Sequence, residues 1–209
     1  MKIAVSFLKS DNYKKCIQKI NNTSADYLHV DMCDGKYVES KNFTIKPLLD
    51  TLSVSTKKLD IHLMVDNPIK YVDDLATLDV DTMTFHLNTC KDPMEVIEYI
   101  HSIGIKVGMA INPDEEVKEL LPYIPYLDEV LVMSVVPGKG GQSFMSEVLP
   151  KIDELIELKV KNHFIIAIDG GINGETINYL KDYPVDMVIS GSYVTESSNY
   201  EGSIQNLHI

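Results

Sequence analysis

The feature that most constrains the fold is a regular alternation of short, β-prone apolar runs with amphipathic helical patterns along the chain. No Pro/Ser-rich linker or low-complexity tract interrupts this alternation. The predicted strands are Lys2–Leu8, Tyr27–Cys33, Leu59–Val65, Thr82–Leu87, Val107–Ile111, Val130–Val135, Phe164–Asp169 and Met187–Ser190. The predicted helices are Asp11–Asn21, Thr44–Leu52, Pro68–Leu78, Pro93–Ile103, Asp114–Leu121, Ser146–Leu158, Gly174–Lys181 and a short last one at Gly202–His208.

About eight strand and helix units in 209 residues predict an α/β fold, a single-domain (β/α)₈ TIM barrel over residues 1–209. The alternative is an open, doubly wound sheet, which would have fewer strands and a glycine-rich turn after the first one. Here the first run ends in Ser6-Phe7-Leu8-Lys9-Ser10, so that glycine-rich turn is missing.

Composition narrows the class of protein. A hydrophobic share of 44% and a charged share of 24% are typical of a soluble globular domain. The net charge of -12 argues against nucleic acid and anionic membranes as partners. No apolar run approaches the roughly 18 residues of a membrane span, and the first residues are too polar for a secretory signal. With three cysteines, we expect a cytoplasmic protein with reduced thiols.

A histidine and a carboxylate stand near the end of the second predicted strand, in His29-Val30-Asp31-Met32-Cys33-Asp34-Gly35. Alternate residues of a strand share a face, so His29 and Asp31 point the same way and can reach one divalent ion. Taken alone, this stretch is better explained by a hydrogen-bonded strand histidine and a turn aspartate. Similar residues near the ends of two later runs, His62 and Asp169, favour a metal site.

In a barrel, the carboxyl ends of the strands converge on one mouth. That geometry gathers Ser6, His29, Asp31, His62, Met133, Asp169 and Ser192 from distant parts of the chain. Two imidazoles and two carboxylates suit zinc, iron, manganese or cobalt rather than a structural zinc site built of cysteines. We expect Cys33 to line the pocket without binding the ion, and His86 to be a hydrogen-bonded wall histidine.

Glycines mark the other side of the predicted mouth, in Pro137-Gly138-Lys139-Gly140-Gly141-Gln142, Gly170-Gly171 and Gly191-Ser192. Each group by itself is most often only a turn. Glycine lets backbone N–H groups approach an anion closely, and loops after the last strands of a barrel commonly bind phosphate. Three such groups after successive strands predict a phosphorylated substrate.

A metal beside a phosphate site gives the two carboxylates a mechanistic interpretation. Asp31 and Asp169 would stand on strands roughly opposite each other, so one could remove a proton from a carbon while the other delivers one to its opposite face. The metal would polarise a carbonyl and stabilise the enediolate between the two steps. Inversion at that carbon follows.

The motifs resemble those of the ribulose-phosphate 3-epimerase family, in order, from Ser6 to Ser192. The residues that carry the resemblance are His29-Val30-Asp31, Asp60-Ile61-His62-Leu63-Met64-Val65, Val132-Met133-Ser134-Val135, Gly140-Gly141-Gln142-Ser143-Phe144, Asp169-Gly170-Gly171-Ile172 and Ser190-Gly191-Ser192. The resemblance implies a barrel that interconverts D-ribulose 5-phosphate and D-xylulose 5-phosphate through an enediolate. It also implies a role in the pentose phosphate pathway and a homo-oligomer.

Residue by residue, the resemblance implies one divalent metal ion on His29, Asp31, His62 and Asp169, with Asp31 and Asp169 also acting as the catalytic acid/base pair. The implied substrate-binding residues are Ser6, His62, Met64, Met133, Gly138, Gly140, Gly141, Gly171, Gly191 and Ser192. The methionines would line the pocket. The phosphate of a ketose would be held by amides around Gly140, Gly141, Gly171, Gly191 and Ser192.

Three departures from the family pattern lie around the mouth. Cys33 stands where the family usually has a third methionine, and Lys139 replaces an aromatic residue. The run Lys36-Tyr37-Val38-Glu39-Ser40 lacks the usual proline and asparagine. These changes leave open an epimerase of a hexulose 6-phosphate such as allulose 6-phosphate, or a phosphosugar-binding barrel without catalysis. Related decarboxylases use an Asp-x-Lys-x-x-Asp array, and Cys33 at the lysine position argues against that chemistry.

Overall fold

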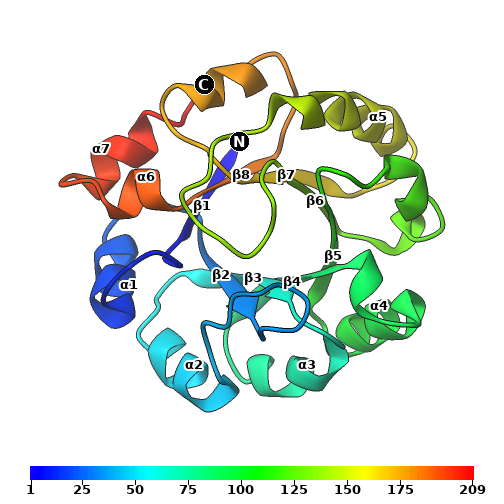
Figure 1. The fold of residues 1–209 in the computed structure, drawn as a ribbon, viewed down its shortest axis with the longest axis horizontal. Helices are drawn as coiled ribbons and strands as arrows, with labels where there is room; N and C mark the ends of the chain where they lie inside the picture. The colour runs from blue at the N-terminus through cyan, green and yellow to red at the C-terminus, as the bar shows by residue number, and fades with distance from the viewer.

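A computed structural model describes residues 1–209 and shows eight parallel strands closed into a barrel in chain order (Figure 1). The strands are β1 Lys2–Ser6, β2 Tyr27–Cys33, β3 Lys58–Met64, β4 Val80–His86, β5 Lys106–Ile111, β6 Glu129–Met133, β7 Ile165–Asp169 and β8 Met187–Ser190. Every neighbouring pair is parallel, and β1 closes the ring against β8. The predicted (β/α)₈ barrel is confirmed.

Helices form a ring outside the barrel (Figure 1). The α-helices are α1 Tyr13–Asn21, α2 Ile45–Leu52, α3 Ile69–Leu75, α4 Pro93–Ser102, α5 Leu149–Lys159, α6 Ser192–Thr195 and α7 Tyr200–Gln205. Short 3₁₀ helices are η1 Leu87–Thr89, η2 Val117–Leu120, η3 Ile124–Tyr126, η4 Ser146–Val148 and η5 Thr176–Leu180. None of these helices is both long and apolar enough to cross a membrane.

Two of the predicted helices are present only as shorter 3₁₀ helices. The segment Asp114–Leu121 contains only the 3₁₀ helix η2, because Pro122 and Pro125 follow it and cannot donate the N–H bonds that a longer helix needs. The segment Gly174–Lys181 contains only η5. There the Asn178 side chain donates to the carbonyls of Gly174 and Glu175, which competes with helical bonding.

The end of the chain also differs from the prediction. Instead of one helix at Gly202–His208, the structure has α6 directly after β8 and then α7. The Asn199 side chain accepts a hydrogen bond from the N–H of Gly202 and so caps α7 at its N-terminus. Because α6 directly follows β8, its first turn begins at Ser192, beside the mouth of the barrel.

Two groups of side chains, one apolar and one polar, fill the inside of the barrel. One part is filled by apolar side chains, among them Ala4, Ala110, Leu131, Ala167, Met187 and Ile189. The other part holds polar side chains that are almost completely buried, namely His29, Asp60, Thr84 and Glu129. Buried polar groups are costly unless they are bonded, so this polar half of the barrel is where a functional site is expected.

Candidate metal centre and substrate pocket

Four side chains converge at the carboxyl ends of β2, β3 and β7: His29, Asp31, His62 and Asp169. One potential ligand atom from each lies within 4.8 Å of the other three. Asp31 Oδ1 is 3.4 Å from His29 Nε2 and 3.3 Å from His62 Nδ1. Asp169 Oδ2 lies 3.9 Å from His62 Nδ1. Strand register contributes directly, because Asp31 is paired with His62 across β2 and β3.

Asp60 on β3 fixes the imidazole of His29 from behind. The Nδ1–H of His29 donates to Asp60 Oδ2 over 2.7 Å, and both side chains are buried. The other ring nitrogen, Nε2, faces the cluster 3.4 Å from Asp31 Oδ1 and makes no hydrogen bond, so it can bind an ion by giving up its proton. A metal-ligating histidine characteristically bonds a carboxylate through its other nitrogen in this way. Asp60 is a site residue that sequence reasoning missed.

His86 on β4 has the corresponding position behind His62. The two Nε2 atoms are 2.8 Å apart, and the rings lie 5.0 Å apart between centroids. Burial, together with the nearby His62, lowers the pKa of His86 well below its usual value. A neutral His86 accepts the Nε2–H of His62, which leaves His62 Nδ1 free to face the cluster. His86 therefore lies outside the four-residue cluster and orients one member of it.

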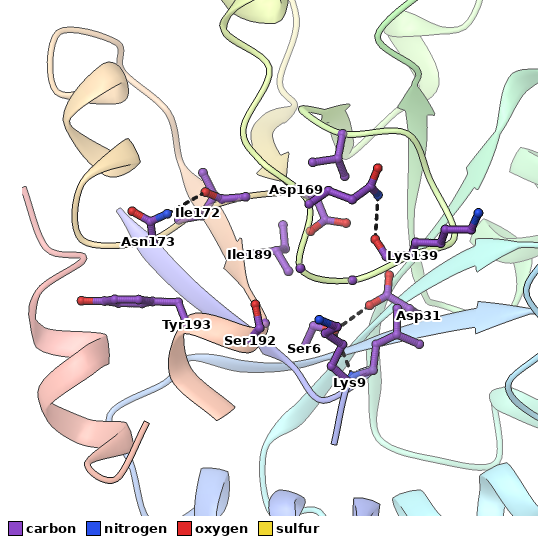
Figure 2. Close-up of a pocket in the computed structure, with 18 of the residues that line it drawn as sticks. Ser6, Lys9, Asp31, Lys139, Asp169, Ile172, Asn173, Ile189, Ser192 and Tyr193 are labelled. Carbon is purple, nitrogen blue, oxygen red and sulfur yellow. Dashed lines mark hydrogen bonds between the residues drawn. The ribbon is translucent and has the colours of Figure 1, made fainter. Parts of the chain in front are cut away.

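Asp31 is held on both its carboxylate and its backbone. The Ser6 hydroxyl donates to Asp31 Oδ2 over 2.6 Å, as the dashed line in Figure 2 marks. The side-chain amide of Asn42 donates to the Asp31 carbonyl over 2.7 Å and accepts from the N–H of Cys33. Asn42 lies in the loop after β2, and nothing in the sequence pattern singled it out.

The two carboxylates of the cluster have opposite pKa shifts. Burial opposes ionisation of Asp31, but the imidazoles of His29 and His62 outweigh it and lower the pKa of Asp31 below its usual range. Burial, followed by the charge of Asp31, raises the pKa of Asp169 to about 6. Two acids whose environments separate their pKa values in this way can serve as a base and a proton carrier.

The cluster fits a divalent ion. It offers two imidazole nitrogens and two carboxylate oxygens, a donor set that suits zinc, iron, manganese or cobalt. The unpartnered Nε2 of His29 is the atom that most directly requires a ligand.

A cavity of about 930 Å³ lies over the cluster at the mouth of the barrel. Asp31 and Asp169 face it, as do nine of the residues expected to bind substrate, Ser6, Met64, Met133, Gly138, Gly140, Gly141, Gly171, Gly191 and Ser192. Figure 2 shows Ser6, Asp31, Asp169 and Ser192 around this common space. His62 is fully buried and does not line the cavity. Cys33 is also fully buried and does not line it, contrary to expectation.

The loop after β6 crosses the mouth of the barrel (Figure 1). It contacts the loop after β2 and the segment after β1. Gly138 packs on Val38, and the Ser40 hydroxyl donates to the Gly138 carbonyl, so the loop after β2 supports it. A Cβ at Gly141 would lie 2.4 Å from the Nζ of Lys9, so the Lys9 side chain packs along this loop. Lys9 is a further cavity-lining residue that the sequence analysis did not select.

The rim residue Lys139 is paired rather than free. Its Nζ lies 3.6 Å from Glu39 Oε2, and both side chains are mostly exposed. The two residues come from the loops after β6 and β2, which are the segments that depart from the family pattern. An exposed pair of this kind contributes little to stability, and Glu39 offsets the positive charge of Lys139 at the edge of the mouth.

Comparisons with known proteins agree with this geometry. A closed parallel barrel with a buried His/Asp cluster at the carboxyl ends of its strands defines an enzyme of the (β/α)₈-barrel class. A sequence profile of the ribulose-phosphate 3 epimerase family matches residues 2–195. The chain belongs to this family and is an isomerase of the epimerase class.

The similarity extends over whole proteins. The ribulose-phosphate 3-epimerase of Helicobacter pylori strain J99 is 38% identical, over 99% of this chain and 96% of that protein. The ribulose-phosphate 3-epimerase of Schizosaccharomyces pombe is 36% identical, over 99% and 92%. Among solved structures, the 3-hexulose-6-phosphate synthase from Salmonella typhimurium superposes with a TM-score of 0.68 at 18% identity, over 99% and 96% of the two chains. That structural likeness shows the fold alone.

Proposed function

We propose that this chain, as one barrel domain over residues 1–209, interconverts D-ribulose 5-phosphate and D-xylulose 5-phosphate by metal-dependent two-base epimerisation at C3. The observation that carries the proposal is the pair Asp31 and Asp169, which face one cavity from β2 and β7 with opposite pKa shifts. The shared name of the similar proteins supports this choice of substrate.

The proposed metal ligands are His29 Nε2, His62 Nδ1 and one oxygen each from Asp31 and Asp169. A bound divalent ion would polarise the ketose carbonyl and stabilise the charge of the enediolate. Asp60 and His86 are hydrogen-bonded to the outer nitrogens of the two imidazoles, which favours the tautomers that this role needs. We propose zinc as the resident ion, by analogy with other mixed imidazole and carboxylate sites.

The two carboxylates exchange roles with the direction of reaction. One removes the C3 proton as a carboxylate, and the electron pair of the C–H bond moves into the enediolate. The other delivers its proton to the opposite face of C3, which restores the carbonyl and inverts the carbon. No proton is consumed overall. Of the two acids Asp169 has the higher pKa, so it is the better proton carrier, and Asp31 is the group that more readily stays a carboxylate.

The phosphate end of the ketose is proposed to lie against the backbone amides of Gly171, Gly191 and Ser192, with the loop that contains Gly140 and Gly141 on its other side. These residues line one side of the cavity, and positive φ angles at Gly141 and Gly171 hold their loops in a conformation that favours glycine. Ser6, Met64 and Met133 would surround the reacting carbons, and Gly138 would support the covering loop. His62 does not line the cavity and would act on the substrate through the metal. By the same family analogy we propose cytoplasmic pentose phosphate metabolism and a homo-oligomer.

The test is deuterium uptake at C3 of ribulose 5-phosphate in deuterated water, followed by NMR with metal-loaded protein and again after chelation. Metal-dependent uptake with formation of xylulose 5-phosphate is expected. Asp31→Asn and Asp169→Asn should each lower turnover by about 10²-fold or more, because each removes one proton-transfer group. Asp153→Asn, an exposed carboxylate on α5, is the matched control.

The single-residue variants also test the two-base assignment directly. Each should retain exchange on only one of the two epimers, because the remaining carboxylate still faces one side of C3. Near-normal epimerisation by either variant would refute two bases. Folded, metal-loaded protein that leaves ribulose 5-phosphate unchanged would refute the pentulose substrate and direct the assay to hexulose 6-phosphates.

A further inference from the structure

Glu129, the first residue of β6, points into the barrel and is only 1% exposed. Its Oε1 accepts a hydrogen bond from the Thr84 hydroxyl over 3.0 Å, whereas its Oε2 has no partner. Thr84, Gly108 and Glu129 form one row across β4, β5 and β6. A Cβ at Gly108 would lie 2.1 Å from Thr84 Oγ1, so the absence of a side chain there lets Thr84 reach Glu129.

Asp60 also has one carboxylate oxygen without a hydrogen-bond partner. Its Oδ2 is bonded to His29, but its Oδ1 is buried without a partner. Asp60 and Glu129 line the same cavity of about 210 Å³, toward the amino ends of the strands and away from the substrate mouth. Each of these two cavity-lining residues therefore keeps one buried carboxylate oxygen without a partner, and the cavity beside them has room for water.

The two lysines that line this cavity are hydrogen-bonded to groups other than Glu129. The other charged or titratable groups that line this cavity are Lys2, Tyr27, Asp81, Lys106, Asp128 and His163. Lys2 Nζ donates to the Tyr27 hydroxyl over 2.8 Å, and Lys106 Nζ donates to Asp81 over 3.0 Å. Burial, and next the charge of Asp60, raise the pKa of Glu129 well above its usual value. A neutral Glu129 carries an O–H that needs an acceptor.

We propose that Glu129 is a positioning residue of the metal centre, which donates its carboxylic O–H through a water molecule in this cavity to Asp60 Oδ1 and so holds Asp60 against His29. The inference rests on the proposed metal site. It adds a third layer behind the ion, in the order His29, Asp60, Glu129, with Thr84 fixing the far end. Outer partners of this kind set the tautomer and direction of a ligating imidazole.

Two substitutions at one position test the idea. Glu129→Gln keeps the shape and places an N–H donor where the acid has its O–H, whereas Glu129→Leu removes the donor. Zinc affinity of the full-length protein is measured by competition with a chromogenic chelator, alongside thermal unfolding of the metal-free protein. We expect Gln to bind zinc within about twofold of wild type and Leu to bind about tenfold more weakly.

Stability separates this role from a merely structural one. Replacing the buried acid by leucine removes its desolvation cost but leaves the Thr84 hydroxyl without its acceptor, so the net change in thermal stability should be small while zinc affinity falls about tenfold. Equal zinc affinity in all three proteins, or a Gln variant as weak as the Leu variant, would overturn the proposal. Failure of wild type to bind zinc would instead refute the proposed metal site.

Infrared spectroscopy gives a readout that needs no metal. The wild-type protein should show the C=O stretch of a protonated carboxylic acid at pH 8, and Glu129→Gln should lack it. If that band is absent from wild type, Glu129 is ionised and the proposal fails. Should Glu129→Leu not fold, Thr84→Val removes the anchoring hydroxyl at the far end and should weaken zinc binding in the same direction, and unchanged binding would count against the proposal.

Discussion

Gly171, in the loop after β7, offers the sharpest test of how the backbone forms the phosphate side of the cavity. Its φ is +65°, and a Cβ would lie 2.3 Å from the N and 2.7 Å from the Cα of Phe144. Alanine in the left-handed region costs about 1–2 kcal/mol, and overpacking against backbone that must shift costs about 1–3 kcal/mol more. The sum of about 2–5 kcal/mol should lower the melting temperature of Gly171→Ala by about 4–20 °C in a chain of this length.

The same displacement should raise KM more than it lowers kcat, because it moves an amide proposed to bind phosphate without touching the acid/base pair. Gly104→Ala is the matched control, since Gly104 has a φ of +79° but no atom within 4 Å of the added Cβ. It should lose only the backbone part of the stability. Equal melting temperatures for the two variants would refute the steric reasoning. An unchanged KM for Gly171→Ala would show that the Gly171 amide does not bind the phosphate.

Two further predictions follow from shifted pKa values. Burial, followed by the charges of Asp31 and Asp34, raises the pKa of Cys33 to about 12, so iodoacetamide at pH 8 should leave this thiol intact in native protein and alkylate it after denaturation, as mass spectrometry would detect. Fast native labelling would contradict the closed loop after β2. The folded pKa of Glu129 lies well above its ordinary value of 4.5, so its contribution to stability is fully present below pH 4.5 and is lost as the pH rises toward the folded pKa. This loss amounts to about 1.4 kcal/mol per pH unit. Urea unfolding should therefore show the advantage of Glu129→Gln over wild type growing from pH 5 to pH 8, and a gap independent of pH would show that Glu129 is not neutral in the folded state.

The barrel could be predicted from the sequence because each strand is a short apolar run separated from the next by a helical pattern. The helices were predicted less accurately where a side chain bonds backbone carbonyls, as Asn178 does, or where proline follows, as after Leu121. The four-residue cluster could be anticipated for a related reason. When parallel strands close into a barrel, the residues near their carboxyl ends all lie at the same mouth of the barrel.

The roles of Asp60 and Glu129 could not be predicted in this way. They depend on which residues of neighbouring strands are paired, and the pattern of residue types does not specify that register. Asp60 shares a face with His62 two residues later, so the sequence does indicate that it points inward. Only the pairing of β2 with β3 shows that it stands opposite His29 rather than one residue away. For Glu129 the available signal is Gly108, a residue without a side chain inside β5. Such a glycine leaves space inside a barrel, and polar side chains from the two flanking strands can meet across it, as Thr84 and Glu129 do here.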